Sequence, residues 1–420
     1  MNRNSPDLTT KTQRAWRQVP LFAMLRRSLC LCGSILLCGS AWAQWKPSSL
    51  GDQERNWSAH LSLQGVYDDN IGTSSSGNSK AGLGESVTPS FSVRLPSERT
   101  SMGLRYTYTY THYDNQLQDQ QTHVADATFF HSFNPRLVLT VQDSVRRGLE
   151  PSLVQDVSGV PVVVRERGDY ILNAFSSTLS YTLTRRWNVS VGGSWQLWRY
   201  DVASYASYLD RDDYSGNASM LYMLTPRTSI GGTYAYTQAQ YVTSGTNGVR
   251  NSNSHTLFLS AFHKFNPMLS AQLSSGVSVF QFVDRQQDFA PYVNLSGVYN
   301  FSSLSSVSAG VTYSMTRAEQ SNFRTVDTAA FYARADYKFT SKLSAALDGA
   351  YILSQYGNPI AASTTGSGQE DSWRLQLSCA YAFQNWVSLT ASYIHEESSS
   401  DLLGRAFDRN RIFMGLNLSY

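Results

Sequence analysis

The sequence predicts an all-β protein, a transmembrane antiparallel β-barrel of about 18 strands with short turns at one end and longer loops at the other. Two observations predict it: apolar and polar residues alternate over long segments, and short polar turns recur along the chain with longer connections between them. Counting the alternating segments gives a range of roughly 16 to 20 strands.

The composition suits strands better than helices. Hydrophobic residues make up 41% of the chain and charged residues 15%, and the aromatic residues comprise 25 Tyr, 19 Phe and 9 Trp. Aromatic residues favour pleated strands, and so few charges are unusual in a soluble domain of this length. The net charge of +3 is small and the charged residues are scattered, so the composition argues against a nucleic-acid partner.

The first 43 residues have the features of a signal peptide. A basic segment ending at Arg27 precedes an apolar stretch over 29–38, and Ala41 and Ala43 form an A-x-A cleavage site. We expect cleavage after Ala43, and Met24 would begin a more compact signal. Residues 44–56 are then a short periplasmic arm and residues 57–420 the barrel. No later run of about 18 apolar residues exists, so the exported chain either stays soluble or crosses a membrane as strands.

Three of the four cysteines fall in this removable segment. The mature chain would keep only Cys379. A disulfide scaffold and a zinc site built from paired cysteines are therefore excluded.

Alternation decides between a soluble and a membrane-spanning fold. From Met102 onward, apolar and aromatic residues alternate with polar ones, and the same pattern recurs over 306–313, 374–383 and 411–420. Such runs span about 9 to 15 residues, enough for a tilted strand to cross a bilayer. The polar face carries Ser, Thr, Arg and Asp, which would not pack as a dry core. The pattern therefore predicts an apolar face toward lipid and a water-filled lumen.

Short turns and longer connections alternate along the chain. The apolar residues that close a strand before a short turn stand at 95, 133, 183, 224, 265, 301, 339 and 383. Their spacing fits two long strands and one longer loop, which predicts short periplasmic turns and longer extracellular loops. We expect the longer connections at 72–79, 148–165, 201–213, 244–254, 357–370 and 398–409. A β-propeller has a similar repeat length, but its blades need four short strands.

The last six residues resemble the C-terminal targeting signal of bacterial outer-membrane barrels. Gly415 precedes alternating apolar residues that include Leu418, and the aromatic Tyr420 ends the chain. The resemblance implies that these three residues form a membrane-insertion signal, with outer-membrane lipid and the barrel-assembly machinery as partners.

The first predicted strand, residues 61–70, ends in Tyr67-Asp68-Asp69-Asn70. It resembles the opening of a β-barrel porin family of Gram-negative outer membranes, in which a Tyr-Asp-x-Asn segment ends the first strand. Members of that family are often associated with exopolysaccharide biosynthesis and export loci. The resemblance implies a location in the cell outer membrane and a barrel fold. By itself, the Asp-Asp-Asn run fits a turn better than a cation site.

Charged residues on the polar face are candidates for lining the lumen. They would attract or screen a polar solute, or they would only link neighbouring strands and contact water. Arg334, Asp336 and Lys338 share one face of one strand and are expected to interact with one another. The candidate lumen-lining residues are Arg94, Arg105, Arg146, Arg334, Asp336, Lys338, Asp348 and Arg374.

Aromatic residues divide into two groups by their position in the alternation. Those on the apolar face near strand ends are expected to form interface girdles: Tyr110, Trp187, Tyr236, Phe339, Trp386 and Tyr420. Tyr113 and Trp198 have the opposite parity and are the candidates for a sugar-stacking track inside the lumen.

Sites for metals and for catalysis are not predicted. Asp210, Asp212 and Asp213 lie together but lack the ligand spacing of a calcium loop, and the seven histidines form no metal motif. No serine stands in a nucleophile elbow. The sequence favours a protein without cofactor or metal that is not an enzyme; an outer-membrane enzyme is the weakest alternative.

Two functional hypotheses follow. In the first, a porin-like barrel gives passage to polar solutes or to an exported polysaccharide through a hydrated lumen. In the second, a non-conducting barrel serves as a structural or assembly component of an exopolysaccharide export system. The sequence leaves the solute, a plugged or open lumen and the oligomeric state undecided.

Overall fold

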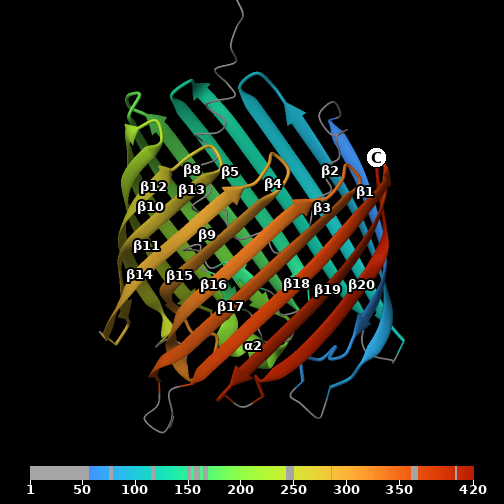
Figure 1. Ribbon diagram of the computed structural model, residues 1–420. Helices are drawn as coiled ribbons and strands as arrows, with labels where there is room; N and C mark the ends of the chain where they lie inside the picture. The colour runs from blue at the N-terminus through green and yellow to red at the C-terminus, as the bar shows by residue number, and fades with distance from the viewer. Residues whose placement is uncertain are drawn as a thin grey trace, which may run out of the picture.

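The chain forms a closed antiparallel barrel of 18 strands, as predicted (Figure 1). The structure is a computed structural model that describes residues 56–74, 79–114, 119–148, 153–155, 161–163, 169–242, 250–284, 286–360, 368–402 and 404–420. The expected signal peptide and all but the last residue of the expected arm lie outside these ranges. Among the described residues, no helix is long and apolar enough to cross a bilayer.

Each strand pairs with its neighbours in sequence, and β1 closes the barrel against β20. The strands are β1 (Trp57–Asp68), β2 (Gly82–Pro96), β3 (Thr100–Tyr113), β4 (Gln120–Asn134), β5 (Leu137–Gly148), β8 (Tyr170–Thr182), β9 (Trp187–Tyr200), β10 (Arg211–Thr225), β11 (Thr228–Tyr241), β12 (Ser252–Lys264), β13 (Leu269–Phe282), β14 (Gln287–Asn300), β15 (Ser306–Arg317), β16 (Phe323–Lys338), β17 (Leu343–Pro359), β18 (Gln369–Gln384), β19 (Val387–Ser400) and β20 (Phe407–Ser419).

The eight predicted short turns all lie at one end of the barrel, near the C-terminus (Figure 1). Their side chains explain why they are tight. Asn134 Oδ1 accepts hydrogen bonds from the backbone N–H groups of Arg136 and Leu137, and Asn266 makes the same pair of bonds in its turn. An asparagine that binds the backbone two residues ahead fixes a turn locally.

The longer connections lie at the opposite end, and several are shorter than expected. The connection predicted at 201–213 contains helix α2 (Ala203–Leu209) and the start of β10, and the one at 148–165 contains the ribbon of β6 (Leu153–Gln155) and β7 (Pro161–Val163). Strands β17 to β20 also extend into the predicted loops. Ser, Thr and Gly at these strand ends resemble loop composition, but their backbones remain paired.

An apolar belt covers the outside of the barrel. In β3, for example, the side chains of Met102, Leu104 and Tyr106 are exposed, and Arg105 and Thr107 between them face the other way. Exposed apolar residues alternate in this way around the whole sheet. A closed sheet has no unpaired edge, and an apolar belt of this kind suits acyl chains. The protein is therefore a transmembrane barrel of the outer-membrane type.

The seam between the first and last strands leaves no room for a side chain at Gly415. A Cβ atom there would collide with the carbonyl oxygen of Leu63 and the Cα atom of Gln64. We expect Gly415→Ala to destabilise the folded barrel by about 1–3 kcal/mol, the usual cost of overpacking. Gly216→Ala is the matched control, because a Cβ atom there meets nothing within 4 Å. The urea midpoint of the refolded barrel should fall for the first variant only; equal midpoints would contradict this account of the seam.

Candidate functional site

The half of the lumen nearest the short turns is polar and accessible. Because the apolar side chains of each strand face outward, the alternate side chains face the lumen. Many of these are hydroxyls that bond across strands, as do Ser58 with Ser92 at 2.7 Å and Ser190 with Ser219 at 2.6 Å. The side chains of Arg105 and Asp126 pair at 2.6 Å and remain 41% and 26% exposed. Partly exposed charges on the inner face indicate a hydrated space.

The eight candidate lumen residues all have inward parity, but they do not form one site. Arg94 stands at the turn end of β2 and Arg146 at the loop end of β5, so the set extends along the height of the barrel. Arg334 pairs with Asp336 at 2.8 Å and with Asp348 at 3.0 Å. The remaining members of the set are Arg105, Lys338 and Arg374, of which Arg374 pairs with Glu396 at 3.2 Å.

The other half of the lumen, nearest the long connections, is filled. Inward-facing side chains there are buried, in contrast to those near the short turns. They include aromatic and aliphatic groups that form four compact clusters inside the barrel. Inward-facing side chains are thus accessible near the short turns and packed together near the longer connections.

The joined ends of β15 and β16 lie inside the barrel. Strand β14 pairs with β15 only as far as Val293 and Tyr313, although β15 continues to Arg317. Beyond that point Met315 packs inside the barrel against Phe280 and Phe282. Residues 314–328, called the plug hairpin below, therefore separate from β14 and bend into the lumen, while residues 325–328 keep their pairing with β17.

Four arginines hold the plug hairpin at its far side. Two extend outward from it: Arg317 Nε donates to Ser252 Oγ at 3.1 Å, and Arg324 Nη2 donates to Asp284 Oδ2 at 2.5 Å. Two extend inward from neighbouring connections: Arg250 donates to the carbonyl oxygen of Ala318, and Arg405 donates to Glu319 at 3.2 Å. These contacts join the hairpin to residues of, or next to, strands β12, β13 and β20, which are not its neighbours in the sheet. Side chains therefore fix the hairpin on the side that has left β14, and the ladder with β17 fixes it on the other.

Helix α2 adds a second part of the closure. Leu209 of the helix is fully buried against Tyr170, Leu172 and Trp198. The guanidinium group of Arg211 lies 4.9 Å from the centre of the Trp198 ring, within the range of a cation–π contact. The loop end of the lumen is therefore lined by arginines that stack on aromatic rings.

The two sugar-track candidates lie within this packed layer. Trp198 is 2% exposed beneath Arg211, and Tyr113 is 3% exposed in a cluster with Val66 and Ile71. Neither ring presents an open face to the lumen in this conformation.

The Asp284 anchor has a defined pH dependence. The hydrogen bond from Arg324 lowers the pKa of Asp284 below its ordinary 3.8. A carboxylate whose pKa is lowered by folding stabilises the folded state above its unfolded pKa, and this contribution is lost as the pH falls through the lowered value. We expect the plug hairpin to keep this anchor from about pH 5 to 8 and to lose it only in stronger acid. Following the hairpin by site-specific fluorescence during acid titration tests this, and Asp284→Asn should abolish the transition; a transition between pH 5 and 8 that depends on Asp284 would contradict it.

The acidic segment after Tyr67 fastens the seam of the barrel. Asp68 accepts two hydrogen bonds from Arg409 Nε at 3.1 Å, and Asp69 accepts from the backbone and side chain of Asn410 at 2.6 and 2.7 Å. Asn70 Nδ2 donates to the Asp408 carbonyl at 2.9 Å. These hydrogen bonds connect the end of the first strand to the last strand. The turn hypothesis did not include this role, because the partners lie at the other end of the sequence.

The aspartates near α2 do not converge on a cation. Asp210 accepts from the Tyr200 backbone, Asp212 binds Arg199 at 2.7 Å, and Asp213 binds Arg211 at 2.9 Å. Among the described residues, no group of three His, Cys, Asp or Glu side chains is placed to hold a metal ion.

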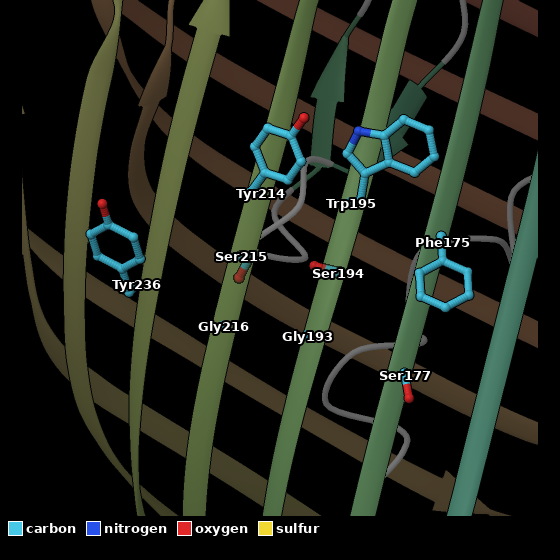
Figure 2. Close-up of a pocket in the computed structure, with 9 residues that line it drawn as sticks. All are labelled: Phe175, Ser177, Gly193, Ser194, Trp195, Tyr214, Ser215, Gly216 and Tyr236. Atoms are coloured by element: carbon cyan, nitrogen blue, oxygen red, sulfur yellow. The ribbon is translucent and has the colours of Figure 1, made fainter.

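A hollow of about 350 Å³ lies on the outer wall, away from the lumen. Figure 2 shows its aromatic frame, with Phe175, Trp195, Tyr214 and Tyr236 rising from neighbouring strands. Gly193 and Gly216 pair across β9 and β10 at its floor. Tyr236, a predicted girdle residue, belongs to this lipid-facing feature.

Comparisons with known proteins give structural likeness only. No family model matches the chain, and no curated protein does either. Among solved structures, the chain is similar to the outer membrane protein OpdK from Pseudomonas aeruginosa, with 14% identity, a TM-score of 0.44 and coverage of 87% of this chain and 99% of that one. OccAB4 from Acinetobacter baumannii has 12% identity and a TM-score of 0.44, with 88% and 99% coverage. OccK2 (OpdF) from Pseudomonas aeruginosa, solved in complex with glucuronate, has 13% identity and a TM-score of 0.46, with 87% and 98% coverage.

Proposed function

We propose that the protein is a gated, porin-like channel of the Gram-negative outer membrane that admits small polar solutes. The observation that carries this proposal is the division of the lumen: a polar, accessible half leads to a layer closed by the plug hairpin. A water-filled lumen with paired charges suits polar solutes, and an inward-folded segment sets the size that passes.

The way the hairpin is held supports a movable closure. Its far side is held by ion pairs and single hydrogen bonds to Ser252, Asp284 and Arg405 rather than by a strand ladder with β14. Such contacts exchange more readily than paired backbone. The segment would bend away from the lumen near Tyr313, where β15 leaves β14, with its β16 side still paired to β17.

Export and assembly complete the proposal. Residues 1–43 would act as the signal peptide, with cleavage after Ala43. Gly415, Leu418 and Tyr420 would be read by the barrel-assembly machinery, which fits their position on the strand that closes the seam. The ring of Tyr420 lies 5.1 Å from that of Trp57, so the last residue contacts the first residue of β1.

A second candidate is a non-conducting structural barrel, favoured by the packing of the closed half. A channel for an exported polysaccharide would use the same lumen but would need a wider opening. The plug hairpin would have to be displaced for the polymer to pass. Planar-bilayer recordings of the refolded mature protein separate these candidates. Ohmic steps, with small sugars but not dextrans entering proteoliposomes, support the small-solute channel. Entry of dextrans supports polysaccharide passage, and silence of both the native protein and a plug-deleted variant supports the structural role.

A further inference from the structure

Two arginines of the packed layer share one carboxylate, and a third, among the described residues, hydrogen-bonds only to carbonyl oxygens. Arg211 and Arg317 share the single carboxylate of Asp213, at 2.9 and 3.7 Å, and the side chains of Arg317 and Asp213 are 8% and 2% exposed. Arg250, also buried, donates to the carbonyl oxygens of Tyr208 and Ala318. Within the described part of the chain, no carboxylate bonds to Arg250, and the preceding residues 243–249 contain no acidic residue. Burying a cation without a counter-charge is costly, so this arrangement favours an added anion.

Hydrogen-bond donors without acceptors gather in the same place. Among the described residues, the donors Arg250 Nε, Arg317 Nη2 and Trp198 Nε1 are buried without a hydrogen-bond partner, against one such acceptor of the same group, Asp213 Oδ1. They belong to one connected group: Trp198 stacks under Arg211, Arg211 and Arg317 share Asp213, and Arg250 binds the carbonyl of the residue after Arg317. A buried donor that lacks an acceptor loses its hydration without compensation. An anion with several oxygens supplies the missing acceptors.

The group also joins parts of the barrel that must separate if the lumen is to open. Arg317 belongs to the plug hairpin, Arg211 begins β10 next to α2, and Arg250 stands just before β12. A ligand held between Arg250 and Arg317 would tie the plug hairpin to the wall.

We propose that Arg211, Arg250 and Arg317 form a binding site for a small oxyanion, a phosphate or carboxylate, which ties the plug hairpin to the wall. Guanidinium groups bind such oxygens in paired, charge-assisted hydrogen bonds, and the aromatic rings behind them keep water away. The ligand is a fixed counter-ion of the closed state. Its binding therefore goes beyond passage of solutes, and only its effect on opening rests on the proposed channel.

Calorimetric titration of the refolded full barrel in detergent tests the site. Inorganic phosphate and acetate are the probes, against chloride at equal ionic strength. We expect saturable binding of at least one oxyanion, weakened roughly tenfold or more by Arg250→Gln because the positive charge and the free Nε donor are lost. Arg105→Gln, which removes an arginine of the accessible half, is the matched control and should leave the affinity unchanged.

Asp213→Asn provides a test of opposite sign. It removes the internal competitor for Arg211 and Arg317, so the oxyanion should bind several-fold more tightly. Heat-modified mobility on gels identifies variants that are folded. Absence of saturable binding by the native barrel, equal affinity in Arg250→Gln, or no tightening in Asp213→Asn would each overturn the site. None of these readouts uses conductance, so the site can fail while the channel stands, and the reverse.

Discussion

Replacing residues 316–324 by two glycines should raise single-channel conductance several-fold. The deletion removes the part of the plug hairpin that crosses the lumen, including Arg317, Glu319 and Arg324 with their anchors on Asp213, Arg405 and Asp284. The parts of β15 and β16 nearest the short turns keep their pairing with β14 and β17, so the wall stays closed. Conductance depends on the narrowest cross-section, which in the proposed channel is formed by the segment removed.

The matched control replaces residues 361–367, which join β17 to β18, by a Gly-Ser sequence of the same length. It changes a connection of the same rim and keeps the end of β17 paired with the plug hairpin. Its conductance should stay at the native level. If the plug deletion folds and conducts no better than this control, the hairpin does not limit passage and the non-conducting role gains support. The single substitution Arg324→Gln should give a conductance between that of the plug deletion and that of the control. We expect more frequent short openings, because three of the four arginine anchors remain.

The fold could be predicted because its signal is local. Every strand carries its own alternation, and each short turn carries its own fixing residue, such as Asn134 or Asn266. The outward or inward direction of each side chain follows from this parity alone. The number of strands and the order of turns and loops could then be predicted by counting these local signals along the chain.

The plug hairpin could not be predicted in the same way. Residues 306–317 alternate without interruption, and the sequence does not mark Tyr313 as the place where the strand leaves the wall. That departure depends on distant partners, namely Ser252, Asp213 and Asp284. Trp198 shows the same limit. The alternation predicts that its side chain faces inward, but its burial depends on Leu209 of α2. The sequence predicts a loop where this helix lies.

Ion pairs between residues close in the sequence could be predicted, and those between distant residues could not. Arg334 and Asp336 are two residues apart on one strand, so their pairing could be anticipated, and they pair at 2.8 Å. Asp68 and Arg409 belong to opposite ends of the chain, and only closure of the barrel brings them together. The residues with the largest energetic roles are therefore those whose partners the linear sequence does not show.

Asp68→Ala should be the most destabilising single substitution among the charged residues discussed. Its carboxylate is 0% exposed and accepts hydrogen bonds from Arg409, which is 3% exposed. Removing one partner of a buried pair leaves the other charge uncompensated, at a cost of about 3–5 kcal/mol. The loss falls on the seam, the one junction that forms between the two ends of the chain. Folded barrels should therefore unfold at a lower urea concentration, and the folded band should disappear at a lower temperature on gels.

Two variants separate the buried charge from a general effect of losing an aspartate. Asp126→Ala removes a similar pair with Arg105 in the accessible half and should cost about 1 kcal/mol or less, since exposed pairs contribute little. The double variant Asp68→Leu with Arg409→Leu removes both charges and should recover much of the stability, because apolar side chains can replace a buried ion pair. Equal losses in Asp68→Ala and Asp126→Ala would show that the seam is not held by this pair. If the double variant were less stable than Asp68→Ala, the hydrogen bonds to Arg409, rather than its unpaired charge, would carry the effect.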